Sequence, residues 1–213
     1  MKTVGVLLLA AVFLLSPLYS QTSIGIIGGP AAANFSTDDD ESDIYSMAAY
    51  GIGGVLEFGF TPIAALRFEP MFLQKGAESD VYIDDFYEFT GMYKINYLEI
   101  PVLLKAEFYI PYVFAGPSIG LLLNSKLVTE AEQGNASIDT KDVTESMDVS
   151  AVVGAGLNFS FGLVSLFLEG RYQLGLTDIL KDGTIYVLDE PIELAGTVKN
   201  RGTQVMIGVM FGI

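Results

Sequence analysis

The chain has no cysteine, no histidine and no tryptophan among its 213 residues. Without cysteine it can form neither a disulfide framework nor a lipid-modified N-terminal cysteine. The absence of histidine and cysteine removes the usual ligands of most zinc sites, and it excludes Ser-His and Cys-His catalytic pairs. We therefore expect a protein that is not an enzyme and that carries no cofactor.

Basic residues are also scarce, because 11 lysines and arginines face 26 acids, for a net charge of −15. This balance argues against binding nucleic acid through its phosphates. Most of the acids are concentrated in four segments, which are Ala33–Tyr45, Ala77–Glu88, Leu127–Asp148 and Thr177–Asn200. We interpret these segments as exposed loops between nearly uncharged, strongly apolar stretches.

The N-terminus has the pattern of a secretory signal peptide. Lys2 precedes an apolar run from Val4 to Leu15, and the small residue Ser20 follows. This run is shorter than the roughly 20 apolar residues that a spanning helix needs. We expect residues 1–20 to be removed on export, which leaves 21–213 as one domain; the alternative is an uncleaved anchor or a buried helix.

Between the acidic segments, apolar and polar residues alternate with a period of two, which is typical of strands whose two faces meet different surroundings. The segment KINYLEIPVLLKAEF, residues 94–108, shows this most clearly. Its apolar face is formed by Leu98, Ile100, Val102 and Leu104. Its other face carries Glu99, Lys105 and Glu107.

Two long uncharged stretches, Phe108–Ser125 and Val149–Leu168, have the length of transmembrane helices. The first contains Pro111 and Pro117, and the second contains several glycines in its middle. Both residue types disfavour helix interiors, so we interpret these stretches as strands joined by short turns.

The strand pattern predicts an all-β fold, an eight-stranded antiparallel transmembrane β-barrel with meander topology. The expected strands are 22–33, 47–59, 62–75, 90–108, 111–126, 147–160, 163–177 and 201–213. Short turns alternate with the long acidic connections, as in outer-membrane barrels, where short turns face the periplasm. A ten-stranded barrel is the alternative, but "TIYVL" and "IELAGTV" in the last long connection are too short to cross and favour a hairpin above the membrane.

A closed sheet with an apolar outer face must hold its charged side chains in the lumen, where they need partners. The charges expected there are Glu57, Arg67, Glu69, Glu99, Lys105, Glu107, Glu169 and Arg171. Pairing of the third and fourth strands predicts that Arg67 lies close to Glu99. This network either fills and locks the lumen or provides a polar path for small ions or protons.

Several stretches together resemble the small porin-family outer-membrane β-barrel domain, the group that includes PorT-like proteins. They are "LRFEPMFLQKG", "YLEIPVLLK", "YVFAGPSIGLLL", "EGRYQLGLTDI" and the closing "VKNRGTQVMIGVMFGI". The resemblance implies location in the bacterial outer membrane. It also implies that the strand Thr203–Ile213 is a signal for the barrel assembly machinery, although the chain ends in Ile213 rather than in an aromatic residue.

The acidic loops suggest two uses. The residues Asp38, Asp39, Asp40, Glu41 and Asp43 form a candidate divalent-cation loop, because hard cations take carboxylate oxygens, but the spacing does not match an EF-hand. The alternative is a solvated loop whose charge prevents aggregation. Tyrosines near strand ends are candidates for the aromatic girdles at the membrane surfaces, although some of them fill the lumen instead. They are Tyr93, Tyr97, Tyr109, Tyr112 and Tyr172.

For function, we expect a non-enzymatic outer-membrane β-barrel with acidic extracellular loops, in an envelope-structural or surface-interaction role. The alternative is a narrow channel or transporter for a small solute. The expected partners are outer-membrane lipid, the assembly machinery and an extracellular or envelope protein. A membrane-embedded hydrolase or acyltransferase and a soluble lipocalin-type barrel fit less well, because histidine is absent and the outer faces are apolar.

Overall fold

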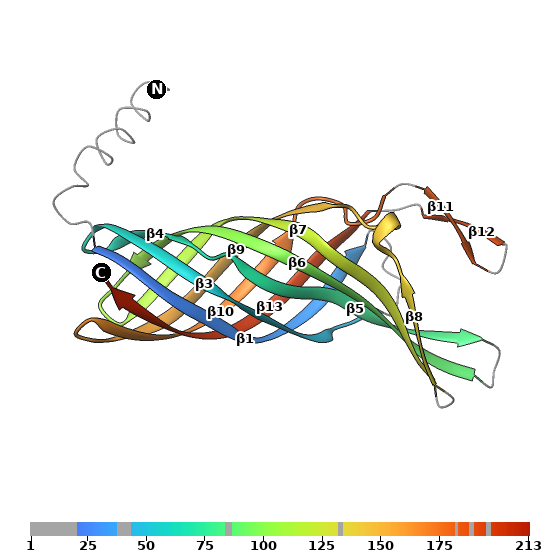
Figure 1. Ribbon diagram of the computed structural model, residues 1–213, viewed down its shortest axis with the longest axis horizontal. Coiled ribbons are helices and arrows are strands. Elements are labelled where there is room, and N and C mark those ends of the chain that lie inside the picture. The colour runs from blue at the N-terminus through green and yellow to red at the C-terminus, as the bar shows by residue number, and fades with distance from the viewer. Residues whose placement is uncertain are drawn as a thin grey trace, which may run out of the picture.

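Antiparallel strands form a ring that closes on itself (Figure 1). The computed structural model describes residues 21–37, 44–83, 87–131, 134–181, 183–187, 190–194 and 197–213, so the expected signal peptide lies outside the described residues. The strands of the ring are β1 (Gln21–Thr37), β3 (Met47–Thr61), β4 (Ala64–Phe68), β5 (Met71–Ile83), β6 (Tyr87–Glu107), β7 (Pro111–Ala131), β9 (Met147–Phe161), β10 (Val164–Gly175) and β13 (Val198–Gly212).

Each strand of the ring pairs with its neighbours in the sequence, and the first strand pairs with the last. The register of β1 with β13 runs from Ser23 opposite Gly212 to Thr37 opposite Val198. Both β4 and β5 pair with β3 on one side and with β6 on the other, so together they form one crossing strand. The ring thus has eight strands in meander order, which confirms the predicted barrel.

The break between β4 and β5 falls at Glu69 and Pro70. Proline has no N–H to donate to a neighbouring strand, so a regular ladder cannot continue through it. Two backbone hydrogen bonds hold the break in place, from the Gly54 N–H to the Pro70 carbonyl at 2.9 Å and from the Glu69 N–H to the Pro101 carbonyl at 3.1 Å. The alternation of faces therefore continues from β4 into β5.

Short turns occupy the barrel end at which β1 begins and β13 ends. They lie at 62–63, 108–110 and 162–163, within two residues of the predicted positions. Gly162 has φ of 68°, a left-handed conformation that suits glycine, and Tyr109 takes φ of 74° in a turn where it is 96% exposed. By the rule for outer-membrane barrels, this end faces the periplasm.

At the opposite end the sheet extends beyond the ring as hairpins (Figure 1). The additional elements there are β2 (Ile44–Tyr45), β8 (Gly134–Asp139), the short 3-10 helix η2 (Lys141–Val143), β11 (Gly183–Val187) and β12 (Glu190–Leu194). Within the described residues β11 pairs only with β12, so the ten-stranded alternative is wrong. Our interpretation of the acidic segments as loops is partly wrong. Strands β1, β5 and β7 continue into three of them, and the β11–β12 hairpin lies in the fourth.

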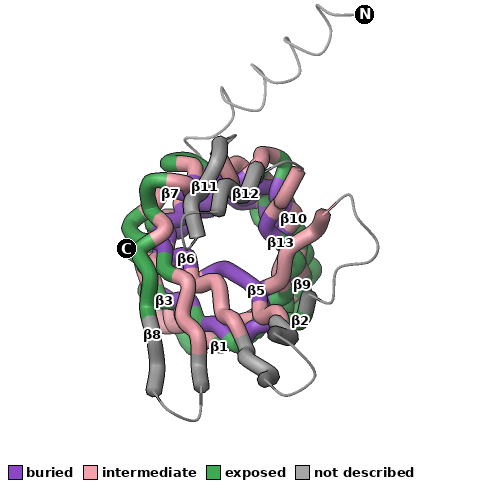
Figure 2. Tube along the Cα trace, turned by 90° about the vertical axis from the view of Figure 1, so that its right-hand side faces the viewer, coloured by how far each residue is buried: buried purple, intermediate pink, exposed green. Residues whose placement is uncertain are grey.

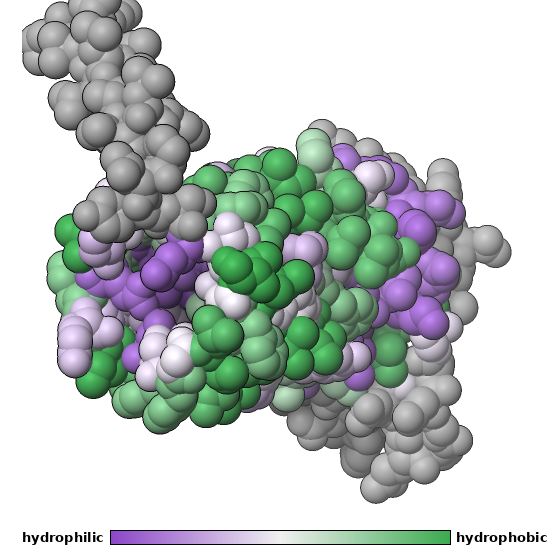
Figure 3. All heavy atoms as spheres, turned by 60° about the vertical axis from the view of Figure 1, so that its left-hand side comes forward, coloured by the Kyte–Doolittle hydropathy of each residue, from purple (hydrophilic) through white to green (hydrophobic). Residues whose placement is uncertain are grey.

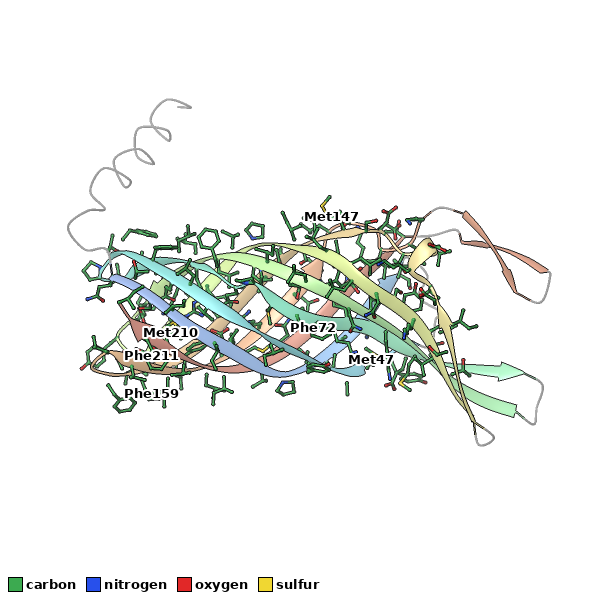
Figure 4. All side chains as sticks on the ribbon, viewed as in Figure 1. Met47, Phe72, Met147, Phe159, Met210 and Phe211 are labelled. Carbon is green, nitrogen blue, oxygen red and sulfur yellow. The ribbon has the colours of Figure 1, made fainter. Side chains whose placement is uncertain are left out.

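The two faces of the sheet differ as the alternation predicts. Buried residues line the inside of the ring when it is viewed from the hairpin end (Figure 2). Met47 and Met210 lie inside and are at most 3% exposed, whereas Met147 and Phe159 project outward (Figure 4). Hydrophobic residues form a belt around the visible outer face, with hydrophilic residues gathered toward both ends (Figure 3). Strands thus occupy the two stretches considered as helices.

Among the described residues, no helix combines the length and the apolar character needed to cross a membrane.

Large side chains inside the barrel lie over glycines of the neighbouring strand. The register places Tyr112 opposite Gly156, and Phe114 opposite Gly154. It also places Phe167 opposite Gly208. A Cβ built on any of these glycines would overlap the aromatic ring beside it. The alternation of large residues with glycine therefore lets an eight-stranded ring, whose interior is just wide enough for side chains, pack without clashes.

Candidate functional site

The charged side chains of the barrel interior form the candidate site. Seven of the eight lumen charges expected from the sequence are at most 8% exposed, and Glu107 is half-buried near the periplasmic turns. They come from β3, β4, β6 and β10 and from the break between β4 and β5. Ion pairs join them into two groups, which we call the periplasmic-side cluster and the extracellular-side cluster.

Arg67 is at the centre of the periplasmic-side cluster, whose other charged members are Glu57, Glu69, Lys105, Glu107, Glu169 and Arg171. Its Nε donates to Glu57 Oε2 at 2.7 Å. Its Nη1 lies 3.0 Å from Glu169 Oε2 and 3.4 Å from Glu69 Oε1. Because β4 and β10 are on opposite sides of the ring, the bond to Glu169 crosses the lumen.

Arg171 makes a second bridge across the lumen in the same layer. Its Nη1 lies 2.6 Å from Glu69 Oε2, and its Nη2 donates to Glu69 Oε1 at 2.9 Å. One hydrogen bond and one close ion contact therefore join the two nitrogens of this guanidinium to the two oxygens of the Glu69 carboxylate. Arg171 also contacts Glu169 on its own strand, with Nε 2.5 Å from Oε1. Two arginines and two glutamates thus brace β10 against the opposite wall.

Lysine and aromatic residues complete the cluster toward the periplasm. Lys105 Nζ lies 3.2 Å from both Glu57 Oε1 and Glu107 Oε1. The Tyr112 hydroxyl donates to Glu169 Oε2 at 2.6 Å, and Lys105 lies 4.5 Å from the centre of the Tyr112 ring. Tyr112 therefore contributes a hydrogen bond and a cation–π contact within the same cluster.

The extracellular-side cluster contains Lys75, Glu99 and Asp148. Lys75 Nζ forms ion pairs with Glu99 and with Asp148 Oδ2, the latter at 2.8 Å. Asn200 Nδ2 donates to Asp148 Oδ2 at 2.9 Å, and Gln173 Nε2 lies 3.3 Å from Glu99 Oε1. The Ser118 hydroxyl also donates to Glu99. These contacts connect five strands of the ring, β5, β6, β9, β10 and β13, with a further donor from β7.

Lys75 and Asp148 were not among the residues expected from the sequence. Lys75 has the same parity as Arg67 and Glu69, and the strand continues past it, so the alternation could have identified it. Asp148 has the parity of Ser150 and Val152 and falls within the expected strand 147–160, but it is also the last residue of an acidic segment that we interpret as a loop. Its position in β9 makes it an inward residue.

The described ion pairs of the lumen join four cations to six carboxylates. The cations are Arg67, Lys75, Lys105 and Arg171. Neutral donors from tyrosine, serine, threonine, glutamine and asparagine supply further hydrogen bonds to the carboxylates. A buried charge is costly without such partners, so the arrangement is suited to holding the walls together.

The expected proximity of Arg67 to Glu99 is wrong. The register places Leu103 opposite Arg67, and Met71 opposite Glu99, so the two charges expected to be close belong to different clusters. The register does not change at the Pro70 break and continues to Ile83 opposite Tyr87, so it places Glu99 four residues from the position opposite Arg67, toward the extracellular side. Of the tyrosines expected in the girdles or in the lumen, Tyr97 and Tyr112 are at most 1% exposed and lie in the lumen, whereas Tyr109 and Tyr172 are exposed.

The candidate divalent-cation loop, Asp38 to Asp43, lies outside the described residues, so cation binding there stays a prediction. Among the residues that the structure describes, no group of three or more acidic side chains has a geometry that could hold a metal ion.

Comparison with known proteins identifies the family. The family described as "Outer membrane protein beta-barrel domain" matches residues 19–181, which is more than half of the chain. None of the curated proteins matches. Among solved structures, the outer membrane protein OprG from Pseudomonas aeruginosa is 12% identical, with a TM-score of 0.53 and with 92% of this chain and 97% of that chain covered.

Two other small barrels are similar at lower TM-scores. Ail, the attachment invasion locus protein of Yersinia pestis, is 15% identical, with a TM-score of 0.45 and with 90% of this chain and 99% of that chain covered. Neisserial surface protein A is 12% identical, with a TM-score of 0.44 and with 89% and 97% covered. Identities this low concern the fold alone, and the narrower resemblance to PorT-like proteins stays a prediction. The chain belongs to the outer membrane protein β-barrel family and resides in the bacterial outer membrane.

Proposed function

We propose that this protein is a non-enzymatic outer-membrane barrel whose lumen is closed by its own side chains. In this proposal its role is envelope-structural or surface-interacting, and its extracellular hairpins and acidic loops make the relevant contacts. The lumen serves as a rigid support for those hairpins rather than as a route for solutes.

The observation that supports the proposal most strongly is the pair of bridges across the lumen, Arg67–Glu169 and Arg171–Glu69. All four side chains are at most 4% exposed, so they block the lumen at this level. Phe167, Tyr112 and Phe114 are buried beside them, with Arg67 over the rings of Phe167 and Tyr112 and Arg171 over the ring of Phe114. Eight-stranded barrels have room for side chains but not for an aqueous pore, which agrees with this reading.

A narrow channel or transporter for a small solute is the second candidate, and buried polar atoms without a partner favour it. Among the described residues they include Arg67 Nη2, Tyr97 OH and Asn200 Oδ1. A cavity of about 10 Å³ beside Lys75, Gln173 and Asn200 has room for about one water molecule. Polar groups and single waters placed in this way could carry protons or small ions between the two clusters.

Conductance measurements separate the two candidates. The chain is purified in detergent, inserted into planar bilayers and compared with the double variant R67A/R171A, which removes both bridges across the lumen. The closed barrel predicts no steady current from the unaltered protein and a measurable current from the variant. Reproducible, ion-selective current from the unaltered protein would favour the channel instead.

Partner contacts belong to the same proposal. The C-terminal strand, Thr203–Ile213, carries outward apolar residues and is the segment expected to be read by the barrel assembly machinery. Phe211 is the aromatic residue nearest its end. Replacing Phe211 by serine should reduce the amount of barrel assembled in the outer membrane of cells, measured by heat-modifiable mobility on a gel. Unchanged assembly would contradict this role.

A further inference from the structure

Two lysines stand directly opposite one another on the outer face of the barrel. Lys94 of β6 pairs with Lys126 of β7 in the register. Two steps along both strands, Asn96 lies opposite Asn124, and its amide nitrogen donates to the Asn124 side chain at 2.7 Å. Between them Ile95 and Ser125 are buried inside, so Lys94 and Lys126 point outward. Like charges placed opposite each other on a sheet destabilise it unless an anion lies between them.

No carboxylate of the described residues forms an ion pair with Lys94 or Lys126. The register places Asp139 opposite Lys126 on its other side. The Asp139 carboxylate, however, accepts the backbone N–H of Lys141 at 2.9 Å. Lys141 also forms no ion pair with a carboxylate of the described residues. Its Nζ donates to the Leu123 carbonyl at 3.0 Å. Three ammonium groups thus lie on adjacent strands and the following turn.

The position of these lysines corresponds to the membrane surface. A row of amides lies next to them on the membrane side, in which Gln74 donates to Asn96 at 3.2 Å and Asn96 donates to Asn124. Two residues further along β6 and three along β7, Leu98 lies opposite Leu121; both face outward and are 38% and 43% exposed. Along this wall the outer surface therefore changes from apolar to amide to cationic within about four residues of each strand, roughly 13 Å.

We propose that Lys94, Lys126 and Lys141 bind the phosphate-bearing headgroup of a lipid in the outer leaflet of the outer membrane. The phosphate accepts hydrogen bonds from the lysine ammonium groups, as phosphates do in basic sites of other proteins. The amides of Asn96 and Asn124 lie where the polar linkage between headgroup and acyl chains would be. The acyl chains lie against Leu98 and Leu121. An anionic protein could satisfy the lysines, but it would leave the apolar wall beneath them uncovered.

The chain as a whole repels anions at a net charge of −15, which makes a cationic patch on this wall unusual. The patch also lies beside the hairpins of β5 with β6 and of β7 with β8, which extend from the same strands. A bound headgroup would therefore neutralise the two opposed lysines at the base of these hairpins. This inference is independent of whether the lumen conducts.

The test measures binding of a bisphosphorylated glycolipid, lipid A, to the full chain purified in a neutral detergent. Three variants are compared with the unaltered protein, each first checked for folding by heat-modifiable mobility. K94Q/K126Q removes the opposed pair, and K94R/K126R keeps its charge. K199Q/R201Q removes two outward bases from β13, on the opposite side of the ring, and so matches the change in net charge.

We expect K94Q/K126Q to weaken binding by roughly 25-fold, or about fivefold for each lysine near a charged membrane surface. The affinity of K94R/K126R should stay within about fivefold of that of the unaltered protein, and the affinity of K199Q/R201Q within about twofold.

Equal losses of affinity in K94Q/K126Q and K199Q/R201Q would mean a general effect of net charge and would overturn the site. Equally tight binding of dephosphorylated lipid A would also overturn it. So would displacement of the lipid by inorganic phosphate at equal concentration, because the patch would then be a free-anion site.

Discussion

Arg67 and Glu169 lie 3.0 Å apart, from Nη1 to Oε2, although 102 residues separate them in the sequence. One is on β4 and the other on β10, which face each other across the ring. Backbone hydrogen bonds connect only adjacent strands, so this pair and Arg171–Glu69 connect the walls where the backbone cannot. All four side chains of these bridges are buried, and removing one partner of a buried ion pair is strongly destabilising.

Replacing Arg67 by methionine should destabilise the barrel by about 3–5 kcal/mol, because it leaves the buried carboxylates of Glu57 and Glu169 without their shared cation. Methionine keeps most of the side-chain volume, so the loss would not be due to a cavity. The measurement is the free energy of unfolding in urea, with the protein refolded into lipid vesicles or detergent micelles.

Arg201→Met is the matched control for this change. Arg201 is exposed on β13 and forms no ion pair among the described residues, so its replacement should change the free energy of unfolding by about 0.5 kcal/mol or less. Equal losses in the two variants would show that the bridge across the lumen contributes nothing specific.

Gly208→Ala should destabilise the barrel by about 1–3 kcal/mol, because the added methyl group overlaps the Phe167 ring packed against it. Gly170→Ala is the control, since a Cβ there meets no atom within 4 Å and faces outward. Its effect should be near zero or stabilising by about 0.4–1 kcal/mol. Thermal unfolding, followed by the shift in gel mobility, compares the two. A stable Gly208→Ala barrel beside a weakened Gly170→Ala barrel would contradict the packing described above.

The barrel fold could be predicted from the sequence because the alternation of apolar and polar residues along a strand is a local property. A lipid-facing residue must be apolar whatever it pairs with, so Leu98, Leu104 and Ile207 identify the outer face without any knowledge of their neighbours. The same parity then places Glu57 and Arg171 inside. Glycine and proline at or next to the short turns allowed the strand boundaries to be predicted to within a few residues.

The sequence could not predict which inward charges form ion pairs with each other, because these pairs depend on the stagger of the strands around the ring. Arg67 was expected near Glu99 on the neighbouring strand, but its contacts lie on both its neighbour β3 and the opposite strand β10. Lys75 and Asp148 were missed for a different reason. Both lie at the ends of expected strands, 62–75 and 147–160, where these strands border acidic segments with a loop-like composition.

Tyr112→Phe should destabilise the barrel by about 1.5–3 kcal/mol, because it removes the hydroxyl that donates to the buried Glu169 carboxylate at 2.6 Å. Tyr172→Phe removes the same atom from a residue that is 40% exposed on the outer face, and it should be close to neutral. Urea unfolding of both variants under the same conditions provides the comparison. If Tyr112→Phe is as stable as Tyr172→Phe, the hydrogen bond to Glu169 does not contribute to holding the cluster.

Ile207→Arg tests the orientation of the wall in the membrane. Ile207 is 65% exposed near the middle of the crossing part of β13, where an arginine facing lipid should cost about 2–4 kcal/mol. Thr203→Arg places the same side chain on the same face but closer to the extracellular end, where the cost should fall to about 0–1 kcal/mol. Both are measured as free energies of unfolding in lipid vesicles. Because only depth differs between the two sites, equal costs would mean that residues 203–207 do not cross the hydrocarbon layer.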